Sequence, residues 1–381
     1  MPHPQDQRPE FTPADQAGPT LDSGQDLSDA LWEQVRQAHR ERTPLVIQGG
    51  GTKAFYGRRI AAERRLELGE HRGIVHYDPV ELVVTVRAGT RLSELESALA
   101  ASGQRLPFEP PHFGDTATVG GMVACGLSGP RRPWSGAVRD FVLGTRVITH
   151  DGKLLRFGGE VMKNVAGYDL SRLMVGAQGT LGVLAEVSFK VLPLPPASAC
   201  LRLEMDEARA LDRLRAWGRE PLPLSGATFA EGVLHVRLEG GEGSVASTRE
   251  RLGGDTDAAT FWEDLREQRL AFFSPQDPRS LWRLSLPARA RRPALSGDWL
   301  CDWAGAQQWL RSDEPAPHVH ETSIAAGGHA TRFGPALDDA PTDGASPFSP
   351  LPKVLARYHQ QLKTRLDPHA IFNPGRLYAD W

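Results

Sequence analysis

The stretch from Gly114 to Gly129, GDTATVGGMVACGLSG, constrains the fold more than any other part of this 381-residue chain. It contains five glycines, two threonines and two alanines, and little that could fill a core. Glycine costs backbone entropy on folding, so a cluster of glycines is typical of a backbone that bends unusually or approaches another group closely. The stretch therefore predicts a site of close approach.

A second glycine loop, Gly49-Gly50-Gly51, follows the apolar run PLVIQ. Such loops can aim successive backbone N–H groups at phosphate oxygens, and threonine hydroxyls beside them can donate further hydrogen bonds. The spacing fits neither the Walker loop nor the Rossmann G-x-G-x-x-G fingerprint. Each loop alone is also typical of an ordinary turn. Together they indicate an anion-binding site of neither of those two kinds.

Bulk properties exclude several classes of protein. A formal net charge of −3 gives no electrostatic case for binding nucleic acid. No apolar run approaches the roughly 20 residues that cross a bilayer. Residues 1–26 are polar and rich in proline, without the apolar segment of a secretion signal, and are interpreted as a disordered lead-in. We expect a cytoplasmic protein without direct membrane insertion.

Three cysteines, Cys125, Cys200 and Cys301, lie far apart in the sequence. An odd and sparse set favours a reducing compartment over a disulfide framework. It also lacks the clustered thiolates of an iron–sulfur site, so we expect no such cluster in this chain.

The first half of the chain has the pattern of an α+β fold, in which strands, helices and a hairpin are separated by glycine loops. Asp151-Gly152 marks the hairpin turn, Thr90 is expected to cap a helix, and Pro193, Pro195 and Pro196 mark a domain boundary. The predicted elements are a helix at 27–41, strands at 44–48, 81–89 and 183–192, a helix from 92 to about 103, and a hairpin at 141–158.

The second half changes character. Residues 197–310 alternate charged helical stretches with short strands, and 311–352 are rich in Pro, Gly and Asp and are predicted as mostly loops, followed by a helix from 352 to about 366. Six of the nine tryptophans lie between 217 and 309. Buried core is favoured for them over a tryptophan-lined pocket, because aromatic side chains dominate core area.

Five short segments, taken in order, resemble the flavoproteins of the vanillyl-alcohol oxidase type, and most closely the E subunits of bacterial glycolate oxidase. The resemblance is strong over residues 44–195, weak in the middle, and returns at the C-terminal tail. The segments are QGGGTK at 48–53, DTATVGG at 115–121, KNVAGYDL at 163–170, GTLGV at 179–183 and FNPGR at 372–376.

The resemblance implies an α+β architecture with four parts. A two-subdomain FAD-binding domain of the PCMH type would span 27–195, after the lead-in at 1–26. A smaller α+β cap domain would span 196–345. The C-terminal helix and tail, 346–381, would pack back on the FAD domain.

The resemblance also implies how FAD is held. The first loop would contact the pyrophosphate, the second would bring main-chain N–H groups and threonine hydroxyls to it, and later positions would lie near the adenosine and the isoalloxazine ring. Because the first loop contains no histidine, we expect non-covalent FAD. The implied residues are Gly49, Gly50, Gly51, Thr52 and Lys53; Pro110, Thr116, Thr118, Gly120 and Gly121; Gly136 and Asp140; and Gly182 and Val183.

The chain departs from catalytic relatives in one segment. Those relatives carry a His-x-Gly-Asp-Gly-Asn-x-His segment in the second domain, whereas the nearest stretch here is HVHETSIAAGGHATRF, with His318, His320, Glu321 and His329. His-x-His beside an acid could bind a metal, but the spacing matches no strong ligand template. A surface loop of unpaired histidines without a metal is therefore the favoured interpretation.

If the chain itself oxidises a 2-hydroxy acid, it must hold the substrate carboxylate with a cation and take the hydroxyl proton with a base. Arg332 and Arg376 are the candidates for the cation and His329 for the base. These assignments rest on position near the segments named above.

Three functions stay open at this point. The first is an FAD-binding subunit of a heteromeric glycolate oxidase that forms glyoxylate, with a D-type FAD subunit and an iron–sulfur subunit as partners and any membrane contact made through them at the inner face. The second is a self-sufficient FAD-dependent 2-hydroxy-acid dehydrogenase. The third is a non-catalytic structural subunit.

Overall fold

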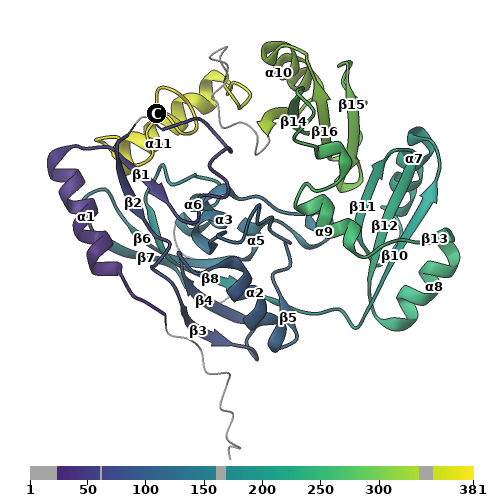
Figure 1. The fold of residues 1–381 in the computed structure, drawn as a ribbon, viewed down its shortest axis with the longest axis horizontal. Coiled ribbons are helices and arrows are strands. Elements are labelled where there is room, and N and C mark those ends of the chain that lie inside the picture. The colour runs from purple at the N-terminus through teal and green to yellow at the C-terminus, as the bar shows by residue number, and fades with distance from the viewer. Residues whose placement is uncertain (1–23, 61, 160–168, 334–345) are drawn as a thin grey trace, which may run out of the picture.

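The computed structural model describes residues 24–60, 62–159, 169–333 and 346–381. The lead-in up to residue 23 and residues 163–168 of the KNVAGYDL segment therefore lie outside the described residues. Two large sheets, one of five strands and one of eight, form two neighbouring bodies (Figure 1). Helices lie against both sheets, which confirms the α+β prediction.

The five-stranded sheet is antiparallel throughout. Its central strand, β8, is buried at every position from Val183 to Phe189, which explains its continuous apolar run. The predicted hairpin at 141–158 is confirmed as β6 and β7. The strand order is β3 (Ile74–Asp78), β4 (Val83–Arg87), β8 (Val183–Lys190), β6 (Val142–Ile148) and β7 (Leu154–Gly158).

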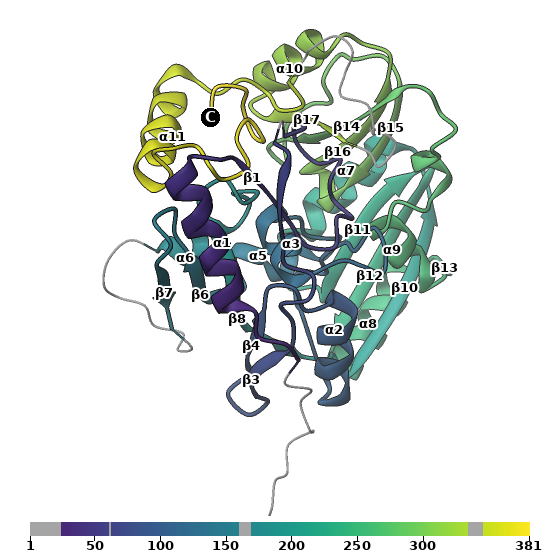
Figure 2. The same ribbon diagram turned by 60° about the vertical axis from the view of Figure 1, so that its left-hand side comes forward.

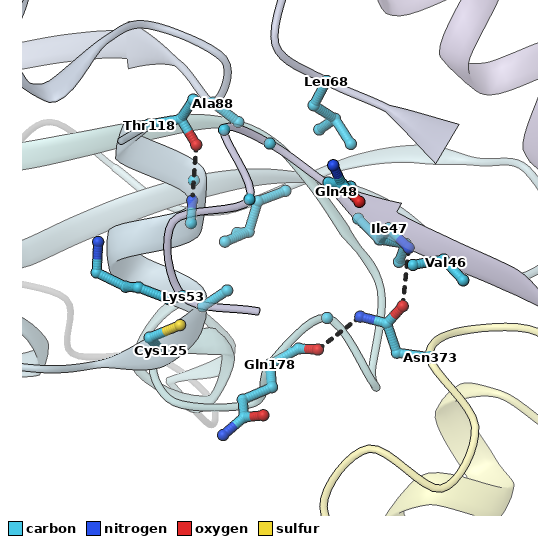
Figure 3. Close-up of a pocket in the computed structure, with 18 of the residues that line it drawn as sticks. Val46, Ile47, Gln48, Lys53, Leu68, Ala88, Thr118, Cys125, Gln178 and Asn373 are labelled. Carbon is cyan, nitrogen blue, oxygen red and sulfur yellow. Dashed lines mark hydrogen bonds between the residues drawn. The ribbon is translucent and has the colours of Figure 1, made fainter. Parts of the chain in front are cut away.

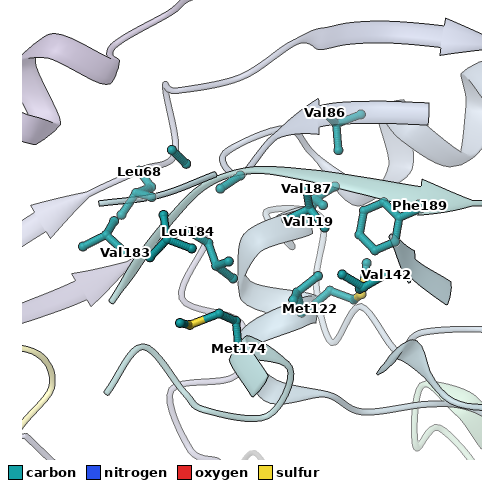
Figure 4. Close-up of a cluster of buried hydrophobic side chains, with 14 of the residues drawn as sticks. Leu68, Val86, Val119, Met122, Val142, Met174, Val183, Leu184, Val187 and Phe189 are labelled. Atoms are coloured by element: carbon teal, nitrogen blue, oxygen red, sulfur yellow. The ribbon is translucent and has the colours of Figure 1, made fainter. Parts of the chain in front are cut away.

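Helix α3 (Val119–Cys125) is formed by the glycine-rich stretch itself. Thr118 caps it, since its hydroxyl accepts a hydrogen bond from the Gly121 N–H at 3.2 Å. Val119 and Met122 point from α3 toward the five-stranded sheet. They pack with Val187 in the hydrophobic core of this first body, called the first core (Figure 4). The prediction of close approach is confirmed, because this short helix lies directly against β4 and β8.

The other helices of the first body were largely predicted. The helix expected at 27–41 is α1, and the helix expected from 92 is α2, but Thr90 does not cap it. Instead, the Thr90 hydroxyl bonds both backbone groups of Gly73, so a tertiary partner takes the place of the capping contact. The helices are α1 (Ser28–Glu41), α2 (Leu92–Ala101), α4 (Arg132–Ser135), α5 (Val138–Phe141) and α6 (Leu170–Met174).

Two smaller sheets complete this body. β1 (Leu45–Gln48) pairs in parallel with β2 (Arg64–Glu67) and leads into the first glycine loop. β5 (Gln104–Arg105) pairs with β9 (Leu192–Pro193), directly before the proline cluster. Figure 2 shows β1 rising between the first sheet and the C-terminal helix.

The eight-stranded sheet forms the second body. Its first strand along the chain, β10, begins at Ala197, and we propose a domain boundary at Pro195–Pro196, between the two sheets. The strand order is β13 (Asp255–Thr256), β10 (Ala197–Glu204), β12 (Val233–Gly240), β11 (Leu224–Ala230), β15 (Asp298–Asp302), β16 (Gln307–Ser312), β14 (Ser280–Ser285) and β17 (His329–Phe333). The helices are α7 (Glu207–Trp217), α8 (Glu242–Leu252), α9 (Thr260–Arg266) and α10 (Ala316–Ala325), with short 3-10 turns at Ala271–Phe273 and Trp303–Gly305.

The prediction of mostly loops at 311–352 is wrong in part, because α10 and β17 lie there. The buried positions of α10 include His320 and Ser323, so its inner face carries polar side chains and the helical pattern is hard to see in the sequence. The prediction for the tryptophans holds for most of them: Trp217, Trp262, Trp282, Trp303 and Trp309 are buried in the core.

The C-terminal segment returns to the first body. Helix α11 (Lys353–Leu366) lies above β1 and the first sheet (Figure 1), and Ile371 and Phe372 are fully buried in the first core. The buried Lys363 ammonium donates to the carbonyls of Thr180 (2.8 Å) and Phe372 (2.9 Å). These contacts fix the tail beside β1.

Buried ion pairs join the two bodies. Glu109, from the first body, accepts two hydrogen bonds of 2.8 Å from Arg237 on β12. Glu239, on the same strand, accepts a 2.6 Å bond from Arg131 of the first body. Burial alone would raise the pKa of Glu109, but Arg237 and Arg131 hold it below the ordinary value. The carboxylate therefore stays charged at the junction.

Candidate functional site

A pocket of about 1030 Å³, its open mouth included, lies in the first body where the two glycine loops meet. Figure 3 shows Lys53 and Cys125 on one side of it and Asn373 on the other. The apolar lining consists of Val46, Ile47, Ile60, Leu68, Ala88, Ala124, Met174, Ala177 and Leu184.

The glycine loops pack directly on each other. A Cβ added to Gly50 would lie 1.5 Å from the Thr116 carbonyl oxygen, and one on Gly49 would lie 2.3 Å from the Thr118 hydroxyl. The Thr116 hydroxyl donates a 2.8 Å hydrogen bond to the Gly50 carbonyl. Only glycine fits where the two backbones come this close.

The first loop leaves backbone donors available. In the described part of the chain, the N–H groups of Gly50, Gly51 and Thr52 have no hydrogen-bond partner, and all three residues line the pocket. Consecutive backbone N–H groups without a protein partner suit an anion. The N–H donors suit the diphosphate of FAD, and the large apolar part of the pocket suits its ring system.

Lys53 adds positive charge to this pocket. Its side chain is 7% exposed, and its ammonium donates to the His112 carbonyl at 2.9 Å. Burial lowers the pKa of Lys53 below its ordinary value. No carboxylate of the described residues forms an ion pair with it, so the ammonium can favour an anionic ligand nearby.

The second loop differs from the expectation that its N–H groups and hydroxyls bind the cofactor. Gly120 donates its N–H to the Ala88 carbonyl at 2.7 Å, and Gly121 donates to Thr118. A Cβ on Gly120 would lie 2.7 Å from the Ala88 Cβ. The Thr116 hydroxyl is likewise used within the protein. The N–H groups of Gly120 and Gly121 are therefore already paired, and these two glycines shape the pocket by close packing.

The structure places the other expected cofactor residues unevenly. Thr118, Gly120, Gly121 and Gly182 line the pocket together with the first loop. Five other expected residues are absent from the pocket lining: Pro110, Thr116, Gly136, Asp140 and Val183. Val183 is buried in the core, and the Asp140 carboxylate accepts a 2.8 Å hydrogen bond from the Ala137 N–H at the start of α5.

Sequence reasoning missed the side chain that ties the C-terminal tail to this pocket. Asn373 donates its amide to the Gln178 carbonyl at 2.7 Å and accepts from the Ile47 N–H at 2.8 Å, as Figure 3 shows. The FNPGR segment was the available signal, but its contacts join residues some 200 and 300 positions apart.

Arg376 also lines the pocket, but its donors are occupied. Its guanidinium hydrogen-bonds to the carbonyls of Lys53, Ala54, Tyr56 and Arg58 and to the Gln178 side chain, at 2.7 to 3.3 Å. The expectation that Arg376 holds a substrate carboxylate is therefore not supported. It fixes the segment that follows the first glycine loop.

Replacing Arg376 by methionine should destabilise this segment. The loss of several charge-assisted hydrogen bonds should lower the free energy of unfolding by about 3 kcal/mol and weaken FAD binding about tenfold. Urea unfolding and FAD titration would measure the two effects. Arg365→Met, an exposed position on α11, is the matched control. Equal behaviour of the two variants would contradict this role.

The structure does not bring the three catalytic candidates together. Arg332 lies on β17, with its guanidinium over the Trp282 ring and a 2.9 Å hydrogen bond to Ser280. His329 starts the same strand, where burial and the nearby Arg283 lower its pKa. Neither residue lines the pocket that contains Arg376. The three candidates therefore do not share the lining of either described pocket, and a catalytic role for them stays a prediction.

The histidine segment is not a surface loop of unpaired histidines. His320 is buried on α10, within 2.9 Å of the Ser349 hydroxyl and 3.1 Å of the Ser346 carbonyl, and its ring packs edge-on against Trp282. Searching only the ranges that the structure describes, we find no group of three or more His, Cys, Asp or Glu side chains arranged to hold a metal.

A second, smaller pocket of about 360 Å³, its mouth included, lies between the two bodies. Its lining includes apolar side chains (Phe113, Leu127, Leu265, Trp309, Phe333) and polar ones (Ser128, Arg266, Gln268, Arg283, Asp302, Gln307). Burial raises the pKa of Asp302 to about 7, although Thr228 donates to its carboxylate at 2.7 Å. This carboxyl group is therefore largely uncharged below pH 7.

Asp302 should make stability depend on pH. The pKa of Asp302 is higher in the folded chain than in the unfolded chain, so its contribution to the free energy of unfolding is complete below about pH 4. As the pH rises from about 4 to about 7, that free energy falls by up to about 4 kcal/mol. Asp302→Asn should remove this part of the decline in the free energy of unfolding. The plots of that free energy against pH should therefore differ most in slope between pH 4 and 7. Urea unfolding across that range measures it. Parallel curves would contradict the prediction.

Comparisons with known proteins also point to FAD binding by this chain. The family model for an FAD binding domain matches residues 27–158. Glycolate oxidase subunit GlcE of Escherichia coli (strain K12) is 57% identical over 355 residues, 93% of this chain and 98% of that protein. Glycolate oxidase subunit GlcD of Bacillus subtilis (strain 168) is 34% identical over 161 residues, 42% of this chain and 34% of its own length.

Among solved structures, p-cresol methylhydroxylase with substrate bound aligns with a TM-score of 0.67 at 16% identity, over 93% of this chain and 88% of that one. At this identity the likeness shows the fold alone. None of the helices in the described ranges is long and apolar enough to cross a membrane.

Proposed function

Because this chain belongs to the family of glycolate oxidase subunit GlcE, we propose that it is the FAD-binding subunit of a heteromeric glycolate oxidase. The complex oxidises glycolate to glyoxylate. Its FAD is non-covalent, since the first glycine loop offers no histidine for attachment. A D-type FAD subunit and an iron–sulfur subunit are the proposed partners, and any membrane contact is made through them.

One observation carries the cofactor assignment: consecutive unpaired N–H groups from Gly50 to Thr52 line a large, mainly apolar pocket. These donors, with the buried Lys53 ammonium, would hold the diphosphate. Bound FAD supplies the chemistry, since it accepts two electrons from a hydroxy acid and releases them to a later acceptor.

The remaining residues of the pocket position and shield the cofactor. The apolar side chains of Leu68, Met174 and Leu184 would exclude water from the bound cofactor and lower the local dielectric, which would strengthen polar contacts to the loop. Asn373 and Arg376 hold the pocket wall together from the C-terminal tail. A rigid wall reduces the entropy lost when the cofactor binds.

The decisive experiment is a visible absorption spectrum of the chain purified alone, followed by anaerobic addition of glycolate. We expect flavin bands that persist with glycolate and bleach once the partner subunits are added. Bleaching by the chain alone would favour the self-sufficient dehydrogenase. Absence of flavin bands after incubation with excess FAD would overturn the cofactor assignment. Unchanged turnover of the whole complex after substitutions that abolish FAD binding by this chain would favour a structural subunit.

A further inference from the structure

The smaller pocket adjoins the FAD pocket. Helix α3 ends at Cys125, which lines the larger pocket, and Leu127, two residues later, lines the smaller one. Phe113 lines the smaller pocket, and its ring centroid lies 5.7 Å from the ammonium of Lys53, a residue that lines the larger pocket. A ligand in the smaller pocket would therefore lie close to the cofactor site and between the two bodies.

Arg283 gives the smaller pocket a positive charge, and the acidic residue in its lining, Asp302, has a pKa raised to about 7 by burial. Within the described ranges, the hydrogen bond of its guanidinium goes to the Tyr56 hydroxyl at 3.4 Å, and its ring contacts are with Tyr56 and Phe333. No carboxylate of the described residues forms an ion pair with it. The side chain is half-buried among aromatic walls, where an ion pair is stronger than in water.

Strand register explains why Arg283, and not Arg332, faces this pocket. Arg283 on β14 pairs with Thr331 on β17 and Trp309 on β16, and Trp309 and Phe333 also line the pocket. Side chains of paired residues lie on the same face, and neighbours along a strand alternate. Arg332 therefore points to the opposite face, toward Trp282.

Gln268 supplies an uncommitted amide at the same pocket. Both polar atoms of its side chain are buried without a hydrogen-bond partner in the described part of the protein. Its backbone has a φ of 56°, a left-handed conformation that is uncommon for residues other than glycine. Unsatisfied buried polar groups and strained backbone together are typical of functional sites.

We infer that this pocket binds a small 2-hydroxy carboxylate, with Arg283 holding the carboxylate and the Gln268 amide bonding the hydroxyl group. The inference deepens the proposed function and rests on it. Guanidinium donors suit a carboxylate, and an amide can both donate to and accept from a neighbouring hydroxyl. The pocket is also much smaller than the cofactor pocket, about 360 Å³ against about 1030 Å³ with both mouths included, which suits a small ligand.

Titration of the full-length, FAD-loaded chain with glycolate tests this site. Trp309 lines the pocket, so tryptophan fluorescence reports binding, and calorimetry gives an independent affinity. We expect Arg283→Met to weaken binding about tenfold to a hundredfold, Arg283→Lys to keep part of it, and Gln268→Leu to weaken it about tenfold. Arg202→Met, an exposed arginine on β10, is the matched control and should bind as the wild type does.

Ligand analogues separate the two contacts. Acetate, which lacks the hydroxyl, should bind more weakly than glycolate, and glycolamide, which lacks the charge, should not compete. Undetectable glycolate binding by the wild type would overturn the inference. So would unchanged binding by a folded Arg283→Met, or loss of binding in Arg332→Met alone.

The two proposals fail in different ways. A wild-type chain that holds FAD and supports turnover of the complex but does not bind glycolate would refute only this site. A chain that binds glycolate through Arg283 but takes up no FAD would refute the proposed function instead. Circular dichroism and thermal unfolding of each variant show whether a lost signal comes from a misfolded chain.

Discussion

Gly50→Ala should reduce FAD binding about tenfold to a hundredfold. Its Cβ would lie 1.5 Å from the Thr116 carbonyl oxygen, so the two glycine loops would have to separate. Overpacking of this kind costs about 1–3 kcal/mol, and here the strain falls on the backbone that carries the unpaired N–H groups. Titration of the FAD-free chain with FAD, followed by flavin fluorescence, measures the loss.

Gly69→Ala is the matched control for this substitution. A Cβ at Gly69 meets nothing within 4 Å, and its backbone does not require glycine. The control should bind FAD as the wild type does and unfold at the same temperature. Wild-type affinity in Gly50→Ala would show that the loops can separate without loss of the cofactor site, and would contradict the assignment of the diphosphate to this loop.

Glu109→Gln should be the most destabilising change at the junction of the two bodies. Glu109 is the partner of both Arg237 and Arg131, whose side chains are only 7% and 8% exposed. Removal of one member of a buried ion pair leaves an uncompensated charge and costs about 3–5 kcal/mol. Urea unfolding should show this loss, together with a weaker link between the two bodies in limited proteolysis.

Glu263→Gln provides the comparison at the surface. Glu263 also pairs with an arginine, Arg269, but both side chains are more than half exposed. An exposed pair of this kind contributes about 0–1 kcal/mol. A loss in Glu109→Gln no larger than that in Glu263→Gln would mean that water or rearranged side chains compensate the buried network.

Local sequence determined several parts of this structure. The 3.6-residue pattern of 27–41 and the Asp-Gly turn of the hairpin act over short distances, so they could be read directly. The glycine loops could also be identified, because a cluster of small residues beside a strand is typical of a backbone that approaches another group closely. The resemblance of the five segments to known flavoproteins identified the family and FAD as the expected cofactor.

Longer-range contacts could not be read in this way. The buried face of α10 is polar, and its His320 is satisfied by Ser346 and Ser349 across a loop. Arg376 was assigned to substrate because it lies in the FNPGR segment. The carbonyls that occupy its guanidinium come from a segment more than 300 residues away.

The sequence by itself determined the glycine loops, the α+β class and the flavoprotein family, because each depends on residue types at short spacing. Tertiary structure alone decided which charged groups face a ligand. Arg283 and Arg332 look equivalent in the sequence, but the pairing of β14 with β17 puts them on opposite faces of one sheet. The physical reason is that side chains alternate along a strand, so register between distant strands sets the face each one shares.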